Sequence, residues 1–272
     1  MTRTRSSGLL LLMLLLVCQA AGAQGWLVAP ARQELTLRPG ESETFVVRLE
    51  REQAKTSAGP VRFSVSPSDW DVTREGEVVL APPQSSLESA NGWVLFSPAS
   101  FVLPAGGMQQ IRVTVTVPLE MLPGVYRAGL FFEEQSTIPP QAEQTKRVVF
   151  RYRLSTLIYV MVPPLDKKVA VRDVEAKENS NGTVTIRALL ANSGSMHLRP
   201  QQWVEVRDER GDTLLKTEPK PTMVLLPGHE LVVELPLPQP LPRRVSYQIR
   251  YLVDAAPGLP LQSTILTLVG RE

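Results

Sequence analysis

The sequence contains very little of the residues that build redox, metal and nucleophilic sites. Its 272 residues include one cysteine and two histidines. Disulfides need pairs of cysteines, and zinc sites are usually built from several Cys and His residues. The Gly-x-Ser-x-Gly, Walker A and His-Glu-x-x-His motifs of common enzymes are also missing. We therefore expect no cofactor, no metal site and no catalytic residues, and we do not expect an enzyme.

Both histidines stand in sequences typical of turns. His197 follows the run Asn192–Met196 (NSGSM), and His229 follows a Pro-Gly dipeptide. A catalytic base needs an orienting partner and a cleft, and neither context indicates one. We therefore expect both side chains to be exposed turn residues. An enzyme on a sandwich scaffold stays open as a third alternative, which a pocket beside Glu133, Glu134 or His197 would favour.

An excess of charge of one sign is also absent. The chain has 29 Lys and Arg residues against 27 Asp and Glu residues. The surplus belongs to Arg3 and Arg5, and without these two residues 27 basic residues face 27 acidic ones. Nucleic-acid binding usually needs a basic surface. The balanced charge therefore predicts no nucleic-acid partner.

The first 23 residues have the pattern of a secretory signal peptide. Two arginines precede an apolar run over Leu9–Val17, and Ala21–Ala23 (AGA) offers a small-x-small cleavage site. A membrane anchor is the alternative, but the run is shorter than the ~20 residues that span a bilayer. We therefore expect residues 1–23 to be removed, the mature chain to have no transmembrane span, and the protein to reach the periplasm. A lipoprotein acylated at Cys18 is a minority alternative, because Val17 stands where a small residue is usual.

Long helical periods are missing as well, and proline is abundant. The 24 prolines amount to about 9% of the residues, against a usual ~5%. Short alternating runs rich in β-branched residues occur instead, which is typical of strands with one buried face. A second series of such runs starts at Val169. The runs of the first series are Thr44–Leu49, Val61–Val65, Glu77–Leu80, Trp93–Phe96, Ile111–Val117, Tyr126–Phe132 and Val148–Val162.

Three of the alternating runs follow a similar turn sequence. Leu-Arg-Pro-Gly at 37–40, Leu-Pro-Ala-Gly at 103–106 and Leu-Pro-Gly at 226–228 each precede such a run. Proline presets φ early in a turn, and glycine supplies the left-handed conformation late in it. Short strands separated by turns of this kind predict an all-β fold made of β-sandwiches.

A domain boundary is predicted at Val162–Lys168 (VPPLDKK). Two prolines followed by charged residues end the longest alternating run, which is typical of a short, stiff linker. About 140 residues precede it and about 105 follow, and each length suits one sandwich. We therefore predict two tandem immunoglobulin-like β-sandwich domains, at residues 24–163 and 164–272, after the signal peptide at residues 1–23.

The longest alternating run, Lys146–Val162 (KRVVFRYRLSTLIYVMV), is the most informative segment. It far exceeds the usual strand length of about 5–6 residues. One interpretation is a central strand whose apolar face meets its own core. The other is a strand at or near a sheet edge, which offers part of its apolar face to another chain by β-augmentation. The apolar face carries Val148, Phe150, Tyr152, Leu154, Thr156, Ile158 and Val160.

The order of these motifs resembles the periplasmic pilus-assembly chaperones (PapD-like), which have two immunoglobulin-like sandwiches set at an angle. The stretches that carry the resemblance are Phe96–Val117, Leu122–Glu133, Thr137–Pro140 (TIPP) and Lys146–Val162. In that family the long closing strand complements an unfinished pilin subunit. The resemblance therefore implies that this strand contacts a protein partner through Val148, Phe150, Tyr152 and Leu154.

The resemblance also implies a carboxylate clamp. The family anchors the C-terminal carboxylate of the subunit with an arginine on the first strand and a lysine on the closing strand. Arg32 is the match for the arginine, whereas Thr156 or Leu157 stands where the lysine is implied. This difference, and the length of Arg62–Asn91, mark the chain as a divergent relative.

We therefore predict an exported periplasmic, chaperone-like binding protein that is not an enzyme. Its partner would be a pilin-like or other exported subunit, bound by β-strand pairing. The alternative is a structural or adhesion module of the cell envelope without chaperone activity.

Overall fold

The computed structural model describes residues 25–52, 59–135, 152–179, 182–241 and 245–269. The predicted signal peptide at residues 1–23 lies outside them. Within the described ranges the regular structure consists of eighteen strands and one short 3-10 helix, η1 (Asn91–Trp93). The prediction of an all-β fold is therefore confirmed.

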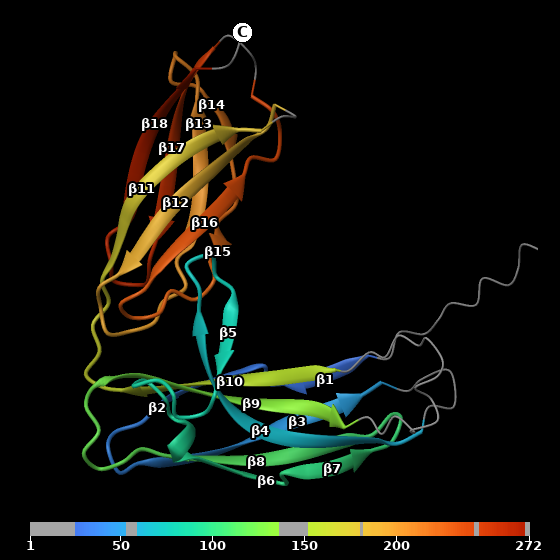
Figure 1. Cartoon of the computed structure of the whole chain (residues 1–272). Coiled ribbons are helices and arrows are strands. Elements are labelled where there is room, and N and C mark those ends of the chain that lie inside the picture. The colour runs from blue at the N-terminus through green and yellow to red at the C-terminus, as the bar shows by residue number, and fades with distance from the viewer. Residues whose placement is uncertain (1–24, 53–58, 136–151, 180–181, 242–244, 270–272) are drawn as a thin grey trace, which may run out of the picture.

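The first ten strands form two sheets packed face to face, which we call the first sandwich (Figure 1). A four-stranded sheet has the order β1-β3-β8-β6, and a six-stranded sheet has the order β2-β10-β9-β4-β5, with β7 paired to β4. The strands are β1 (Trp26–Ala29), β2 (Arg32–Thr36), β3 (Ser42–Arg51), β4 (Val61–Val72), β5 (Val78–Ala81), β6 (Val94–Ser97), β7 (Ser100–Leu103), β8 (Met108–Thr116), β9 (Gly124–Gln135) and β10 (Arg153–Val162).

The other eight strands form the second sandwich (Figure 1). One sheet has the order β11-β12-β16, and the other has the order β14-β13-β17-β18, with β15 paired to β13. The strands are β11 (Val169–Glu178), β12 (Val184–Asn192), β13 (Gln201–Arg207), β14 (Thr213–Lys216), β15 (Lys220–Pro221), β16 (Glu230–Pro236), β17 (Ser246–Asp254) and β18 (Gln262–Val269).

The alternation read from the sequence places side chains in the core. In β8, Ile111, Val113 and Val115 are fully buried, whereas the residue between the first two, Arg112, is exposed. In β10, Ile158 and Val160 belong to the same apolar core of the first sandwich, which we call the first core. The prediction of one buried face is therefore confirmed for β8. In β10 the other face is buried as well, because Tyr159 and Met161 belong to the apolar cluster at the junction of the two sandwiches.

The Pro-Gly turns also adopt the predicted conformation. Gly40, Gly106 and Gly228 have φ values of 84°, 71° and 74°. Residues with a Cβ atom rarely adopt this left-handed region. Each glycine therefore allows the chain to reverse before the strand that follows.

The two sandwiches meet at an angle, so that the molecule has the shape of an L (Figure 1). Residues 163–168 connect β10 to β11, and the predicted boundary at 163/164 falls in this connection. Asp166 ties the connection to the second sandwich, because its Oδ1 accepts hydrogen bonds from the Ser195 amide (2.8 Å) and hydroxyl (2.7 Å). A third apolar cluster fills the junction, made of Trp70, Val72, Val125, Tyr159, Met161, Val224 and Leu226.

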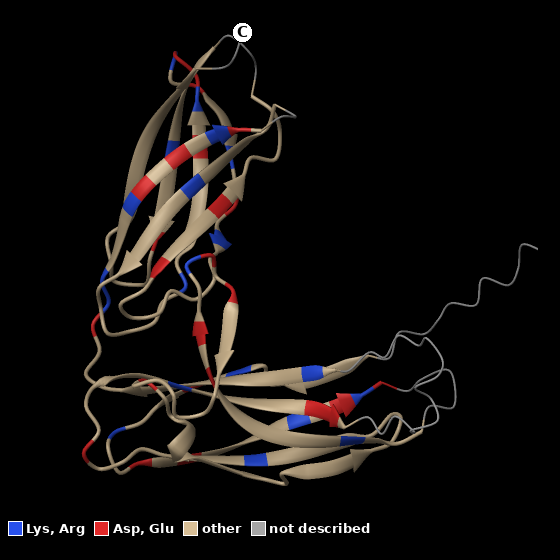
Figure 2. Cartoon of the chain, in the orientation of Figure 1, with Lys and Arg blue, Asp and Glu red and all other residues tan. Residues whose placement is uncertain are grey.

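Charged side chains of both signs are interspersed over both sandwiches (Figure 2). On the second sandwich, Glu175, Arg187 and Glu234 stand opposite one another on β11, β12 and β16. The Arg187 guanidinium lies 3.1 Å from Glu175 and 4.0 Å from Glu234. Exposed pairs of this kind add little stability. The mixed charge on the surface matches the balanced composition of the sequence.

A Gly228→Ala substitution tests the role of the left-handed turns. A Cβ atom there would meet nothing within 4 Å, so its cost comes from φ alone. We expect a loss of about 1–2 kcal/mol in the free energy of unfolding, measured by urea or thermal unfolding. Gly124→Ala is the matched control, because its φ is not positive and its Cβ would make ordinary contacts at 3.5 Å. Equal loss in both variants would contradict the assignment.

Candidate functional site

The predicted partner-contact residues lie where β10 begins. Val148 and Phe150 are outside the described residues. Tyr152 directly precedes β10, is 38% exposed, and its ring centre lies 6.0 Å from that of Trp26. Leu154 is partly buried and packs against the first core. The apolar face of the predicted long strand therefore reaches the end of the first sandwich.

The strand β10 is central along one part and open along another. Over Leu157–Met161 it pairs with β2 in parallel and with β9 antiparallel. Over Arg153–Thr156 its one partner among the described strands is β9. The central and the edge interpretations of the sequence therefore each apply to one stretch of β10.

The direction of the main chain shows which hydrogen-bonding groups the open stretch presents. The Leu157 amide points toward β2 and donates to the Ala31 carbonyl at 3.0 Å. Main-chain groups alternate in direction along a strand, so those of Arg153 and Ser155 point to this same side. Two N–H donors and two C=O acceptors thus face away from β9, on a side where none of the described strands pairs with them.

Arg32 is the first residue of β2 and lies beside a later part of β10 than Tyr152 and Leu154. It stands opposite Leu157 in the register between β2 and β10. Its guanidinium Nε lies 3.1 Å from Oε1 of Glu34. Thr156, one of the two positions where the resemblance implies a lysine, is fully buried, and its hydroxyl donates to the Pro30 carbonyl at 2.7 Å.

Glu34 is the centre of an ionic cluster that sequence reasoning missed. Besides Arg32, its Oε1 contacts Nη1 of Arg199 at 2.8 Å and Nε2 of His197 at 3.4 Å. The Arg199 guanidinium also lies 5.1 Å from the ring centre of Tyr159. Because Glu34 belongs to β2 and both new partners follow β12, the cluster joins the two sandwiches.

The prediction that His197 is an exposed turn residue is wrong. The side chain is buried and stacks on the ring of Tyr159, with ring centres 4.4 Å apart. Its Nδ1 is buried and has no hydrogen-bond partner among the described residues. The turn is present as predicted, but it packs against Tyr159 and Glu34 of the first sandwich. His229 also differs from the expectation, because it is half-buried and its Nε2 lies 3.0 Å from Oδ1 of Asp71.

Burial and charge act in opposite directions in the Glu34 cluster. Burial alone would raise the pKa of Glu34, but His197 and Arg199 hold it below its ordinary value. Burial lowers the pKa of His197, although Glu34 opposes that effect. The carboxylate is therefore charged and the imidazole is neutral near pH 7.

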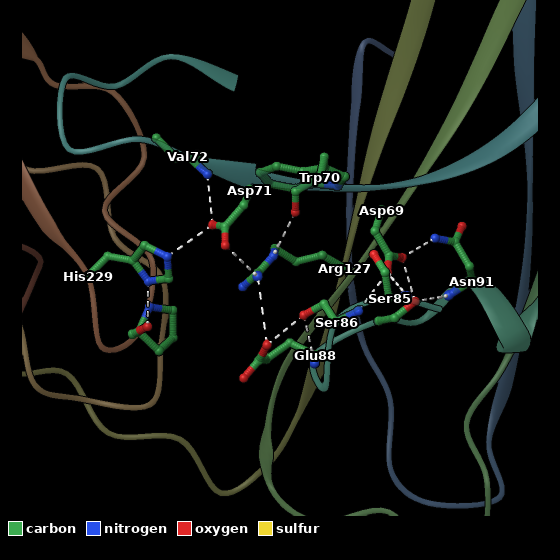
Figure 3. A network of polar contacts seen from close by, with 12 residues as sticks. Asp69, Trp70, Asp71, Val72, Ser85, Ser86, Glu88, Asn91, Arg127 and His229 are labelled. Atoms are coloured by element: carbon green, nitrogen blue, oxygen red, sulfur yellow. Dashed lines mark hydrogen bonds and ion pairs between the residues drawn. The ribbon is translucent and has the colours of Figure 1, made fainter. Parts of the chain in front are cut away.

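A second network organises the loop between β5 and η1 (Figure 3). Asp69 is buried at the end of β4, and its Oδ2 accepts hydrogen bonds from the amides of Ser85 (2.7 Å) and Ser86 (3.0 Å). Its Oδ1 accepts from the hydroxyl of Ser89 (2.5 Å) and the side-chain amide of Asn91. Burial would raise the pKa of Asp69, but these hydrogen bonds hold it below its ordinary value. One carboxylate thus fixes residues 85–91.

Arg127 extends this network to the second sandwich (Figure 3). Its guanidinium is buried, and Nε donates to the Trp70 carbonyl at 3.3 Å. Its Nη2 lies 3.7 Å from Asp71 and 3.9 Å from Glu88. Asp71 in turn contacts His229, so the chain of polar contacts crosses the junction.

The described residues contain no group of three or more His, Cys, Asp or Glu side chains that could hold a metal ion. Within the same ranges, none of the helical structure is long and apolar enough to cross a membrane. What the described residues present here is a stretch of β10 with one paired strand, the aromatic side chains of Trp26 and Tyr152, and charged side chains.

A His197→Gln variant tests the pH dependence of the Glu34 cluster. The folded-state pKa of His197 lies below its ordinary value of 6.5, so the unfolded chain takes up the proton first. The wild type is therefore expected to lose stability as the pH falls from about 7.5 to about 5.5, and the variant to lose less. The contribution of Glu34 is lost only below 4.5. Urea unfolding at both pH values measures this, and an unchanged pH dependence of the free energy of unfolding in His197→Gln would refute it.

An Asp69→Asn variant tests the anchoring of residues 85–91. An amide has one acceptor oxygen and places N–H donors against the existing donors. We expect a loss of about 1–3 kcal/mol in the free energy of unfolding and faster hydrogen exchange at the amides of Ser85 and Ser86. Asp173→Asn, at an exposed position on β11, is the control. Unchanged exchange at both serine amides would show that the loop is held by other contacts.

The chain is similar to solved structures of pilus chaperones. No family model and no curated protein matches it. A chain from the chaperone–tip adhesin complex of CFA/I fimbriae biogenesis is 14% identical, with 90% of this chain and 99% of that chain covered, at a TM-score of 0.46. A chain from the CsuC–CsuE chaperone–tip subunit complex of Acinetobacter baumannii is 13% identical, with 91% of this chain and 100% of that chain covered, at a TM-score of 0.43. The CupB2 chaperone of Pseudomonas aeruginosa is 13% identical, with 89% of this chain and 100% of that chain covered, at a TM-score of 0.39.

Proposed function

We propose that this protein is exported to the periplasm and there binds an exported protein subunit by β-strand pairing, as a chaperone-like protein that is not an enzyme. The observation that carries the proposal is the open stretch of β10. Over Arg153–Thr156, β9 is its one partner among the described strands, whereas β2 covers the same side from Leu157 onward. An added strand would find main-chain groups at this place that no described strand pairs with.

The aromatic end of the first sandwich supports the proposal. The Trp26 ring packs edge-to-face on Phe63, with ring centres 4.9 Å apart, and lies beside Tyr152. The indole Nε1 of Trp26 is buried and has no acceptor among the described residues. A buried donor without an acceptor is costly, so the described residues leave this end of the sandwich incompletely satisfied.

Side chains along the same segment would set the register of the bound strand. Tyr152 and Leu154 lie on the apolar face of the described part. We propose that Val148 and Phe150 continue this face toward the partner, because the sequence alternation extends through them. Arg32 lies at the other end of the open stretch, opposite Leu157.

Export is proposed from the pattern of the first 23 residues. If they are removed, the one cysteine of the chain goes with them. The remaining chain then needs no disulfide in an oxidising compartment. Its two packed cores provide the stability instead.

Ser155→Pro is the sharpest test of strand pairing. Proline removes one outward N–H and is tolerated at sheet edges, so the pairing with β9 is kept. A lost hydrogen bond costs about 0.5–1.5 kcal/mol and the ring also obstructs a neighbouring strand, so we expect about tenfold less partner recovered. The measurement is affinity purification from the periplasm of the native host, quantified by mass spectrometry.

Ser155→Ala is the matched control, because it keeps the main-chain N–H. Both variants must show the thermal unfolding of the wild type. Hydrogen exchange adds a second measurement, since the amides of Arg153 and Ser155 are expected to become protected in the complex. Full recovery of the partner by folded Ser155→Pro would refute strand pairing at this edge.

A further inference from the structure

A cleft of about 320 Å³ opens at the junction of the two sandwiches, away from the open stretch of β10. Its lining includes Leu87 and Glu88 of the loop that Asp69 holds between β5 and η1, Tyr126 and Arg127 of β9, and His229 of the second sandwich. This volume falls in the range of pockets that hold small ligands or large side chains. The proposed strand pairing at β10 makes no use of the cleft.

The apolar rim of the cleft is exposed although its backbone is fixed. Leu87 is 96% exposed, and it lies between Ser86 and Ser89, which are both held by Asp69. Leu122, just before the lining residue Pro123, is 72% exposed, and its carbonyl accepts a hydrogen bond from the Tyr126 hydroxyl at 3.0 Å. Large aliphatic side chains presented on a rigid backbone lose little entropy on binding.

The accessible charge at the cleft is acidic. The side chains of Glu88 and Asp71 are 53% and 45% exposed, whereas the guanidinium of Arg127 between them is 4% exposed. Asp71 does not line the cleft and its Oδ1 contacts His229, so the accessible charge of the lining is the carboxylate of Glu88. An approaching group therefore meets apolar surface beside an exposed carboxylate whose partner guanidinium is buried, which favours a cation next to an apolar side chain.

The main chain at the start of β9 also faces this cleft. The Arg127 amide donates to the Glu88 carbonyl, and the Arg127 carbonyl accepts from the Ala90 amide, both at 2.7 Å. These groups point away from β10. By the alternation of a strand, the N–H and C=O of Val125 point the same way, and Val125 lines the cleft. Val125 is itself 4% exposed, so this part of β9 forms the buried floor of the cleft.

We propose that this cleft is a second protein-docking site, which binds an extended segment carrying a large apolar side chain next to a lysine or arginine. The apolar side chain packs against Leu87, Leu122 and Tyr126. The cation pairs with Glu88. The site is independent of the open stretch of β10.

The test uses capped five-residue peptides of the form Gly-X-Z-Thr-Gly, added to the full chain with labelled leucine methyl groups. With X arginine and Z phenylalanine, we expect saturable shifts of the Leu87 and Leu122 methyl signals. With X glutamate, or with Z serine, we expect at least about tenfold weaker binding, which is the effect of one good contact. Binding of the glutamate peptide with equal affinity would overturn the charge assignment.

Variants locate the binding. Leu87→Ser is expected to weaken the arginine–phenylalanine peptide by about tenfold, and Glu88→Gln is expected to remove its advantage over the glutamate peptide. Leu95→Ser is the control, because Leu95 is 74% exposed on β6 of the other sheet of the first sandwich. Undiminished binding to Leu87→Ser overturns the proposal. So do Leu87 methyl shifts that grow with protein concentration alone, which would assign the cleft to a second copy of this chain.

Discussion

The burial of Trp70 at the junction of the two sandwiches is the interaction on which the rest of the structure depends. The ring is 2% exposed, its Nε1 donates to the Ala128 carbonyl at 3.0 Å, and it packs edge-to-face on Tyr159. Val224 and Leu226 of the second sandwich complete the apolar cluster around it. A large aromatic side chain with its polar group satisfied gives a strong and directional contact. It holds the two sandwiches in one relative position.

The two neighbours of Trp70 in β4, Asp69 and Asp71, form the polar networks at the junction. Asp69 fixes the loop that carries Leu87, and Asp71 joins Arg127 to His229 across the junction. Because successive side chains of a strand point to opposite faces, one short stretch of β4 serves the apolar cluster and the polar networks together. A disturbance at Trp70 would therefore reach the cleft and the Glu34 cluster at once.

The local pattern of the sequence predicted the strands, the Pro-Gly turns and the inward face of β10, because each depends on residues close together in the chain. The same pattern could not predict that β10 is covered from Leu157 onward but open before it, since β2 comes from a distant segment. The burial of His197 and its contact with Glu34 were missed for the same physical reason. Glycine, serine and asparagine around His197 do signal a turn, but a turn sequence does not show which other surface will pack on it.

The parallel strand β2 covers β10 from Leu157 onward, so the open stretch of β10 ends at Thr156. A strand added beside Arg153 and Ser155 cannot continue past Thr156, because β2 already occupies the place next to Leu157. The added strand must stop or turn there, and the residue at that end of it then lies beside Arg32. If a foreign strand binds there as proposed, the start of β2 would limit how far it can slide along β10 and would select one register among those that main-chain hydrogen bonds alone would allow.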